Sequence, residues 1–98
     1  MDTPTANGSP PRFLSLIPIL RMFDEAKARE FYCGFFGFAV DFEHRFEPSA
    51  PLYLQLSRSG IRLHLSEHHG DASPGATLQV TVDDVQALHR ELSDKRYR

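Results

Sequence analysis

Four residues in the middle of the chain have side chains that can bind a metal ion or transfer a proton: His64, Glu67, His68 and His69. Imidazole and carboxylate groups are ordinary ligands of zinc and nickel. Adjacent residues of a strand point to opposite faces, so these groups converge only where the loop folds back. We therefore interpret them as solvated loop residues, with His64 and Glu67 as weak candidate metal ligands.

A second set of polar side chains alternates with leucines and valines in three short runs. A period of two is typical of strands that bury one face. The apolar positions are expected to pack against helices, so the polar positions share the other face. They are Tyr53, Gln55, Arg62, His64, Thr77 and Gln79. On a concave sheet these groups suit an organic ligand with planar or anionic parts, whereas on a flat sheet they only meet water.

The runs at residues 52–57 and 61–66 are predicted to form a β-hairpin. Leucines occupy alternate positions in both runs, and Ser59-Gly60 between them is a short turn signal. We therefore expect two antiparallel neighbouring strands.

A helix over residues 25–36 is predicted to follow a strand over residues 14–22. Asp24 supplies an N-cap oxygen for this helix, and Gly37 suits its end. Pro18 donates no ladder hydrogen bond, which places the first strand at an edge or at a bulge. The apolar stripe of the helix is expected to comprise Ala28, Phe31, Tyr32, Phe35 and Phe36.

After Gly37 the period changes to two, which predicts a strand over residues 38–43. Phe42 falls in the apolar register of this strand and is therefore also a candidate core residue. Asp41 and Glu43 alternate onto one face and are interpreted as ordinary surface charges.

A second unit is expected after a linker over residues 70–76, which is rich in turn-forming residues. A strand over residues 77–82 and a helix capped by Asp83 or Asp84 are predicted to follow. The apolar side of this helix carries Val85, Leu88 and Leu92. The expected organisation is a leader over residues 1–12, a first module over residues 13–69, the linker, and the start of a second module over residues 77–98.

The composition is that of one small globular domain of 98 residues, with 41% hydrophobic and 24% charged residues. The formal net charge of -2 provides no positive field for nucleic-acid phosphates. Cys33 is the single cysteine, which excludes an internal disulfide and favours the cytoplasm. No apolar run approaches the roughly 20 residues of a membrane span, so no membrane partner is expected.

Three stretches resemble, in order and spacing, the glyoxalase, bleomycin-resistance and extradiol-dioxygenase (vicinal oxygen chelate) superfamily. They are Ile19 to Phe38 with its aromatic pair and closing Gly-Phe, Gly60 to Glu67, and Val80 to Leu88. The resemblance covers residues 15–95 and implies an α+β fold of βαβββ modules. Three strands that should follow the second helix are lacking, so the second module is expected to be truncated.

The resemblance implies a small-molecule binding protein of the bleomycin-resistance type. Such a protein sequesters a bulky antibiotic or related ligand in a groove formed by curved sheets, without metal catalysis. A homodimer is expected, because a single module leaves its curved sheet half closed. The expected ligand contacts are Phe42, Phe46, Tyr53, Arg62 and His64, with Gln55, Thr77 and Gln79 on the same face.

Metal-dependent lyases, isomerases and dioxygenases of the superfamily are the alternative. Their first-strand ligand corresponds to Ile17 here, and its counterpart in the second module corresponds to Thr77. Neither side chain is a good metal ligand, so no cofactor is expected and a divalent metal belongs to the alternative. A third alternative is an interaction module without a small ligand, which a flat and open polar face would favour.

Overall fold

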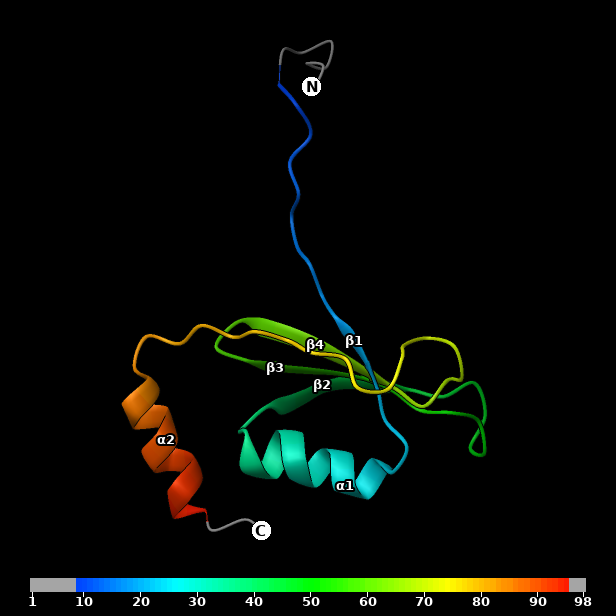
Figure 1. Cartoon of the computed structure of the whole chain (residues 1–98). Coiled ribbons are helices and arrows are strands. Elements are labelled where there is room, and N and C mark those ends of the chain that lie inside the picture. Colours follow the sequence, from blue (N-terminus) through cyan, green and yellow to red (C-terminus); the bar gives the residue numbers. More distant parts are fainter. Residues whose placement is uncertain (1–8, 96–98) are drawn as a thin grey trace.

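The computed structural model describes residues 9–95 and combines one mixed sheet with helices on one of its sides (Figure 1). In chain order the elements are β1 (Ile19–Arg21), α1 (Glu25–Arg29), the π-helix η1 (Glu30–Phe35), β2 (Ala39–His44), β3 (Tyr53–Arg58), β4 (Ile61–Ser66) and α2 (Val85–Asp94). The order of the strands in the sheet is β1-β4-β3-β2. The predicted α+β class is confirmed.

β3 and β4 form the predicted antiparallel hairpin. Arg58 pairs with Ile61, so the turn between them has two residues. Both have a positive φ, 54° at Ser59 and 78° at Gly60, which is typical of a type I′ turn. This turn matches the right-handed twist of the strands and fixes the register across the hairpin.

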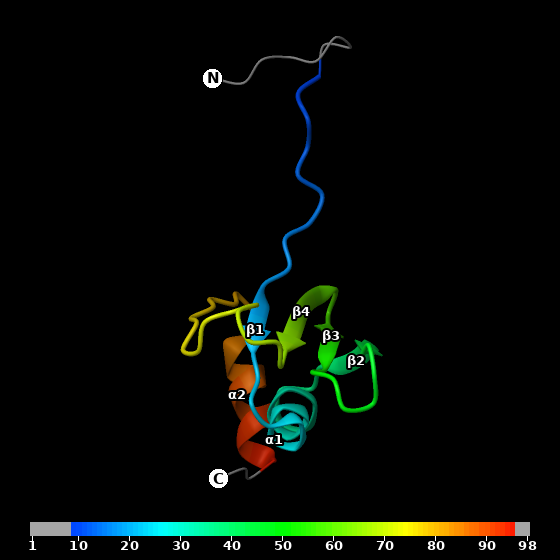
Figure 2. The same cartoon turned by 90° about the vertical axis from the view of Figure 1, so that its right-hand side faces the viewer.

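β1 lies at the edge of the sheet, parallel to β4, and is shorter than predicted. The carbonyl of Pro18 accepts a hydrogen bond of 2.9 Å from the backbone N–H of His64, while the proline nitrogen has no hydrogen to donate. The edge position expected from this proline is therefore confirmed. Residues 9–16 run away from the sheet as an extended, exposed segment, here called the arm (Figure 1, Figure 2).

β2 contains a β-bulge at Asp41 that changes which side chains face the helices. Val40 pairs with Leu56, but Phe42 pairs with Gln55, so β2 uses one residue more than β3. A shift of one residue moves every following side chain to the other face. Phe42 therefore leaves the core register and points away from the helices.

The two acidic residues of β2 consequently point to opposite faces. Asp41 accepts hydrogen bonds from Gln55 at 3.0 Å and from Ser57 at 2.8 Å, on the face away from the helices. Glu43 instead pairs with Arg29 of α1 at 3.1 Å. The prediction that both acidic residues share one face is wrong, because the bulge interrupts the period of two.

The helical segment begins and ends where predicted. Asp24 Oδ1 accepts a hydrogen bond of 3.0 Å from the N–H of Lys27, which satisfies one of the free N–H groups at the helix start. At the other end Gly37 has a φ of +75°, and the N–H of Phe38 donates to the carbonyl of Tyr32 at 2.9 Å. A glycine suits this position because it adopts a positive φ without steric cost.

The second half of this segment is the π-helix η1 rather than the expected α-helix. The N–H of Phe36 donates to the carbonyl of Phe31, five residues back, at 3.0 Å. This wider turn rotates the apolar stripe, so Tyr32 and Cys33 pack against the core while Phe31 is 46% exposed. The predicted stripe is therefore wrong at Phe31.

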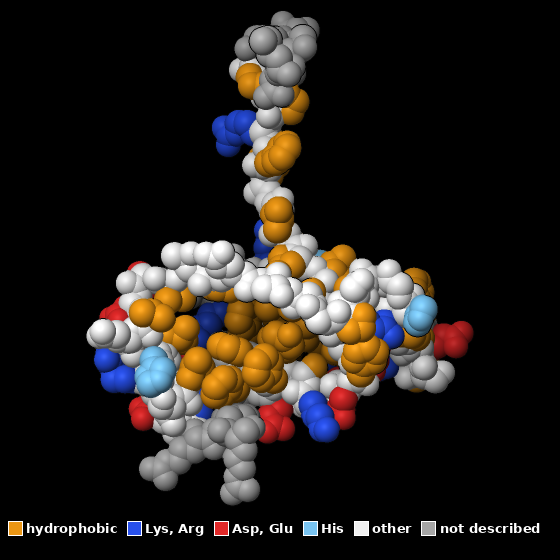
Figure 3. All heavy atoms as spheres, in the orientation of Figure 1, with side chains coloured by type: hydrophobic (Ala, Val, Ile, Leu, Met, Phe, Trp, Pro, Cys, Tyr) orange, Lys and Arg blue, Asp and Glu red, His pale blue; other side chains and the backbone are white. Residues whose placement is uncertain are grey.

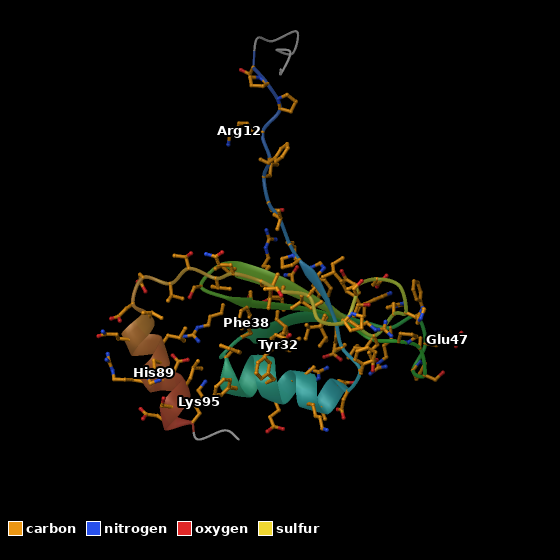
Figure 4. The ribbon with its side chains drawn as sticks, in the orientation of Figure 1. Arg12, Tyr32, Phe38, Glu47, His89 and Lys95 are labelled. Carbon is orange, nitrogen blue, oxygen red and sulfur yellow. The ribbon has the colours of Figure 1, made fainter. Side chains whose placement is uncertain are left out.

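The hydrophobic core lies between the sheet and the helical segment. Tyr32 and Phe38 point into this layer (Figure 4). Leucines at alternate positions of the hairpin are buried, as their period of two predicts. The buried hydrophobic residues of the described chain are Leu20, Met22, Ala28, Leu52, Leu54, Leu56, Leu63 and Leu65.

The predicted strand over residues 77–82 is wrong. These residues are exposed and belong to no strand of the sheet. A strand needs a neighbour for its backbone N–H and C=O groups, and none of the described strands pairs with this segment. The following helix is present, with Asp84 as its N-cap accepting from the N–H of Ala87 at 2.9 Å. Val85 is exposed, whereas Leu88 and Leu92 are half-buried.

Some of the predicted organisation falls beyond what the structure describes. Residues 1–8 of the expected leader and residues 96–98 of the expected second module lie outside the described residues. Within residues 9–95, no helix has both the length and the apolar character that crossing a membrane requires.

Candidate ligand-binding face

The face of the sheet turned away from the helices, here called the open face, carries polar side chains from neighbouring strands. The register pairs Gln55 with His64, and Ser57 with Arg62, across β3 and β4. Directly opposed residues of antiparallel strands point to the same face, and Tyr53 shares it because it lies two residues before Gln55. The structure therefore brings these polar residues together as the period of two predicted.

Four of these side chains join Asp41 in one continuous series of hydrogen bonds, here called the polar chain. Tyr53 Oη lies 2.5 Å from Nδ1 of His64. Nε2 of the same imidazole lies 3.0 Å from Oε1 of Gln55. Gln55 Nε2 donates to Asp41 Oδ2 at 3.0 Å, and Ser57 Oγ donates to Asp41 Oδ1 at 2.8 Å. The polar chain thus connects β4, β3 and β2.

Asp41, which links Gln55 and Ser57 in the polar chain, is ionised. The hydrogen bonds from Gln55 and Ser57 lower the pKa of Asp41, and the charge of Arg62 acts in the same direction. Together these effects outweigh desolvation, which by itself would raise the pKa of Asp41. At neutral pH the carboxylate therefore only accepts hydrogen bonds.

Tyr53, at one end of the polar chain, is protonated. Partial burial raises the pKa of Tyr53, and the negative charge of Asp71 raises it further. At neutral pH the phenol therefore keeps its proton and can donate it to His64.

Aromatic rings surround the polar chain on the open face. The ring of Phe42 meets His64 edge to face, with centroids 5.9 Å apart, and Tyr53 meets the same imidazole at 5.0 Å. His44 pairs with Tyr53 across the strands, and Phe46 lies 4.9 Å from the His44 ring. Phe42 and Phe46, both predicted ligand contacts, are 45% and 79% exposed. Exposed rings of this kind offer stacking surfaces to a planar ligand.

Thr77 and Gln79 are not brought to the open face by strand pairing. They were expected there as alternate residues of a strand, and residues 77–82 are not a strand. The period of two in this segment therefore does not identify a face of the sheet.

The residues present do not fit the metal site of the superfamily's enzymes. Ile17 offers no ligand atom, and both ring nitrogens of His64 already face Tyr53 and Gln55. Glu67 Oε1 instead accepts the N–H of Leu52 at 2.9 Å. Within residues 9–95, no three His, Cys, Asp or Glu side chains are grouped so that they could hold a metal ion.

An apolar groove of about 580 Å³ lies away from the open face, between α2, the hairpin turn and residues 80–84. Hydrophobic side chains gather in this region between α2 and the α1–η1 segment (Figure 3). None of the predicted ligand contacts lines the groove. Its apolar walls include Phe36, Phe38, Ile61, Val82, Val85 and Leu88.

Three residues of the open face were missed as site residues by the sequence analysis: Asp41, His44 and Ser57. Ser57 follows the same period of two as Gln55, so that signal was sufficient to find it. Asp41 lies in the polar register of its predicted strand, so the period of two also placed it on this face. The position of His44 depends on the bulge, which no regular period reveals.

The sequence matches a family model described as "Glyoxalase superfamily protein" over residues 2–98. The chain belongs to the glyoxalase superfamily. This confirms the family expected from its sequence motifs. No curated protein matches the chain.

Several solved structures share its fold. One is a glyoxalase/bleomycin resistance protein from Streptomyces sp. CB03234, with 24% identity and a TM-score of 0.64 over 82% of this chain and 72% of that one. Another is an antibiotic binding protein from the same organism, with 24% identity and a TM-score of 0.64 over 82% and 68%.

A third similar structure is that of a protein–drug complex. It is the bleomycin-binding protein from bleomycin-producing Streptomyces verticillus, complexed with copper(II)-bleomycin. Its identity to this glyoxalase-superfamily chain is 29% and the TM-score is 0.63. The match covers 86% of this chain and 65% of that protein.

Proposed function

We propose that this glyoxalase-superfamily chain binds a small organic molecule on its open face and sequesters it without metal catalysis. The observation that carries the proposal is the polar chain, which fixes Tyr53, His64 and Gln55 in one arrangement beside the exposed ring of Phe42. Prearranged polar groups next to aromatic surface are typical of small-molecule sites. Similarity to an antibiotic binding protein and to a bleomycin-binding protein supports this function.

Bleomycin and copper(II)-bleomycin are the probes for this proposal, because a similar protein is complexed with the copper form. We expect saturable binding in a titration followed by calorimetry. Phe42→Ala should raise Kd by about three- to tenfold, because an aromatic contact contributes about 0.5–1.5 kcal/mol. Val40→Ala is the matched control, since Val40 lies on the same strand opposite the core residue Leu56. Equal effects of the two changes, or no saturable binding, would contradict the proposal.

Elemental analysis of the dialysed protein tests the metal-free part of the proposal. We expect substoichiometric zinc, nickel, iron and manganese, because Ile17 and Thr77 replace two of the expected ligands. A stoichiometric metal that survives dialysis would instead favour the lyase or dioxygenase alternative.

The arm supports a homodimer as the binding unit. Leu14 and Leu16 are 86% and 88% exposed and Phe13 is fully exposed, although all three are apolar. An extended segment with exposed apolar side chains is suited to pairing with another chain. A second copy of this chain is the partner we propose, since a two-fold dimer lets each arm cover the other subunit.

Light scattering after size exclusion tests the dimer. We expect twice the monomer mass of 11.1 kDa for the wild type. Replacing Phe13, Leu14 and Leu16 together by serine should give the monomer mass. Phe23→Ser is the control, because Phe23 is also exposed but lies outside the arm. A wild-type monomer at high concentration would contradict the proposal.

A further inference from the structure

We propose that Asp41 sets the direction of every hydrogen bond in the polar chain, so that Tyr53 presents an acceptor to the ligand. The ligand would then place an N–H or O–H donor at Tyr53, beside an aromatic part that meets Phe42. This inference rests on the proposed binding at the open face and names the chemistry that the ligand needs there.

The direction begins at the carboxylate of Asp41. An ionised carboxylate has no proton to donate, so both of its hydrogen-bonded neighbours must be donors. The NH₂ group of Gln55 therefore donates to Asp41 Oδ2 at 3.0 Å, and the hydroxyl of Ser57 donates its proton to Asp41 Oδ1 at 2.8 Å. The amide carbonyl of Gln55 is consequently left facing His64.

The carbonyl of Gln55 then fixes the tautomer of His64. Because a carbonyl oxygen only accepts, Nε2 of His64 must carry the hydrogen across the contact of 3.0 Å. In a neutral imidazole the other nitrogen, Nδ1, is then an acceptor. Tyr53 must therefore donate its hydroxyl proton to Nδ1, across 2.5 Å.

Tyr53 has only one hydroxyl proton, and the polar chain uses it. What remains for a ligand is the pair of acceptor sites on the phenolic oxygen. Aromatic amines, amide N–H groups and hydroxyl groups can donate to these acceptor sites. A carboxylate or phosphate has no proton to donate, so its lone pairs would face those of the phenolic oxygen. The anionic ligand parts that the sequence predicted therefore do not suit this position.

Replacement of Asp41 by a donor tests the direction. In Asp41→Lys the introduced ammonium group needs an acceptor, so the Gln55 amide should turn its carbonyl towards it. The NH₂ group would then face Nε2 of His64, and the imidazole hydrogen should move to Nδ1. Asp41→Asn should keep the wild-type tautomer, because its amide oxygen still accepts from Gln55. This variant separates hydrogen-bond direction from charge.

The readout is the ¹⁵N chemical shift of the two ring nitrogens of His64. Long-range ¹H–¹⁵N spectra distinguish a protonated ring nitrogen from an unprotonated one, at a pH well above the range in which imidazoles ionise. We expect the Nε2–H tautomer in the wild type and in Asp41→Asn, and the Nδ1–H tautomer in Asp41→Lys. Glu47→Lys controls for the change of charge, because Glu47 lies in the loop between β2 and β3 and is not part of the polar chain (Figure 4). An Nδ1–H wild type, or an unchanged tautomer in Asp41→Lys, would overturn the proposal.

Aniline and N,N-dimethylaniline test the ligand chemistry, because only aniline can donate an N–H hydrogen bond. In the wild type we expect aniline to shift the NMR signals of Tyr53 and His64 more than its dimethyl derivative does. In Asp41→Lys this preference should disappear. Equal shifts with both amines in the wild type, or no shift with either, would overturn the assigned ligand class. Failure of bleomycin to bind would contradict the proposed function alone, since the tautomer is measured without any ligand.

Discussion

Arg58 of β3 and Glu91 of α2 form a two-point ion pair, in which Nη1 and Nη2 each lie 2.8 Å from a carboxylate oxygen. Nη1 of Arg58 also donates to the carbonyl of Phe36 at 2.7 Å. Lys95 Nζ donates to the neighbouring carbonyl of Phe35 at 2.6 Å. Two cations therefore join α2 to the carboxyl end of η1, where positive charge is favoured by the helix dipole.

Arg58→Lys tests this attachment. Lysine keeps the charge but lacks the planar fork that binds both oxygens of Glu91. We expect amide hydrogen exchange in α2 to accelerate roughly two- to fivefold, which is the effect of a partly exposed ion pair. Arg62→Lys is the control, because Arg62 lies on the open face of the same hairpin. An unchanged α2 after Arg58→Lys would mean that its half-buried leucines alone hold the helix.

Acid should loosen the same contact. The hydrogen bonds from Arg58 lower the pKa of Glu91 below its ordinary value of 4.5. A depressed folded-state pKa contributes stability that is fully present above the unfolded value and is lost as the pH falls through the folded one. We therefore expect the protection factors of the α2 amides, which compare observed with intrinsic exchange at the same pH, to fall below about pH 4.5 in the wild type. Glu91→Gln should remove this part of the pH dependence, and a persisting acid transition in that variant would assign it to another group.

Leu54→Ala tests the core of the hairpin. Leu54 is fully buried between the sheet and the helical segment, so its truncation leaves a cavity. We expect a loss of about 2–5 kcal/mol in the free energy of unfolding, measured with urea. Leu14→Ala should cost less than about 0.5 kcal/mol, because Leu14 is exposed on the arm. Similar losses in both variants would show that the core does not centre on the hairpin.

Much of the fold was predictable because local signals agreed with the final packing. The alternating leucines of β3 and β4, the turn at Ser59-Gly60 and the N-cap at Asp24 each depend on neighbouring residues. Such features are predictable where the backbone preference of the local sequence and burial in the core favour the same conformation. Tyr53 and His64 were placed on one face for this reason.

The remaining features depend on distant partners. The bulge at Asp41 arises in the pairing of β2 with β3, and it moves Phe42 to the open face, where Asp41 already lies. Residues 77–82 have the pattern of a strand, but a pattern does not supply the neighbouring strand. The change to a π-helix after Arg29 likewise has no signal in a hydrophobic period computed for an α-helix.

Gly60→Ala tests the turn that fixes the register of the open face. Gly60 has a φ of +78°, and an added Cβ would meet no atom within 4 Å, so only backbone strain opposes the change. We expect the free energy of unfolding to fall by about 1–2 kcal/mol. Gly60→Asn should cost less, because asparagine tolerates a positive φ better than alanine does. Urea unfolding of both variants measures the difference, and equal losses would indicate that the turn is held by contacts rather than by its backbone conformation.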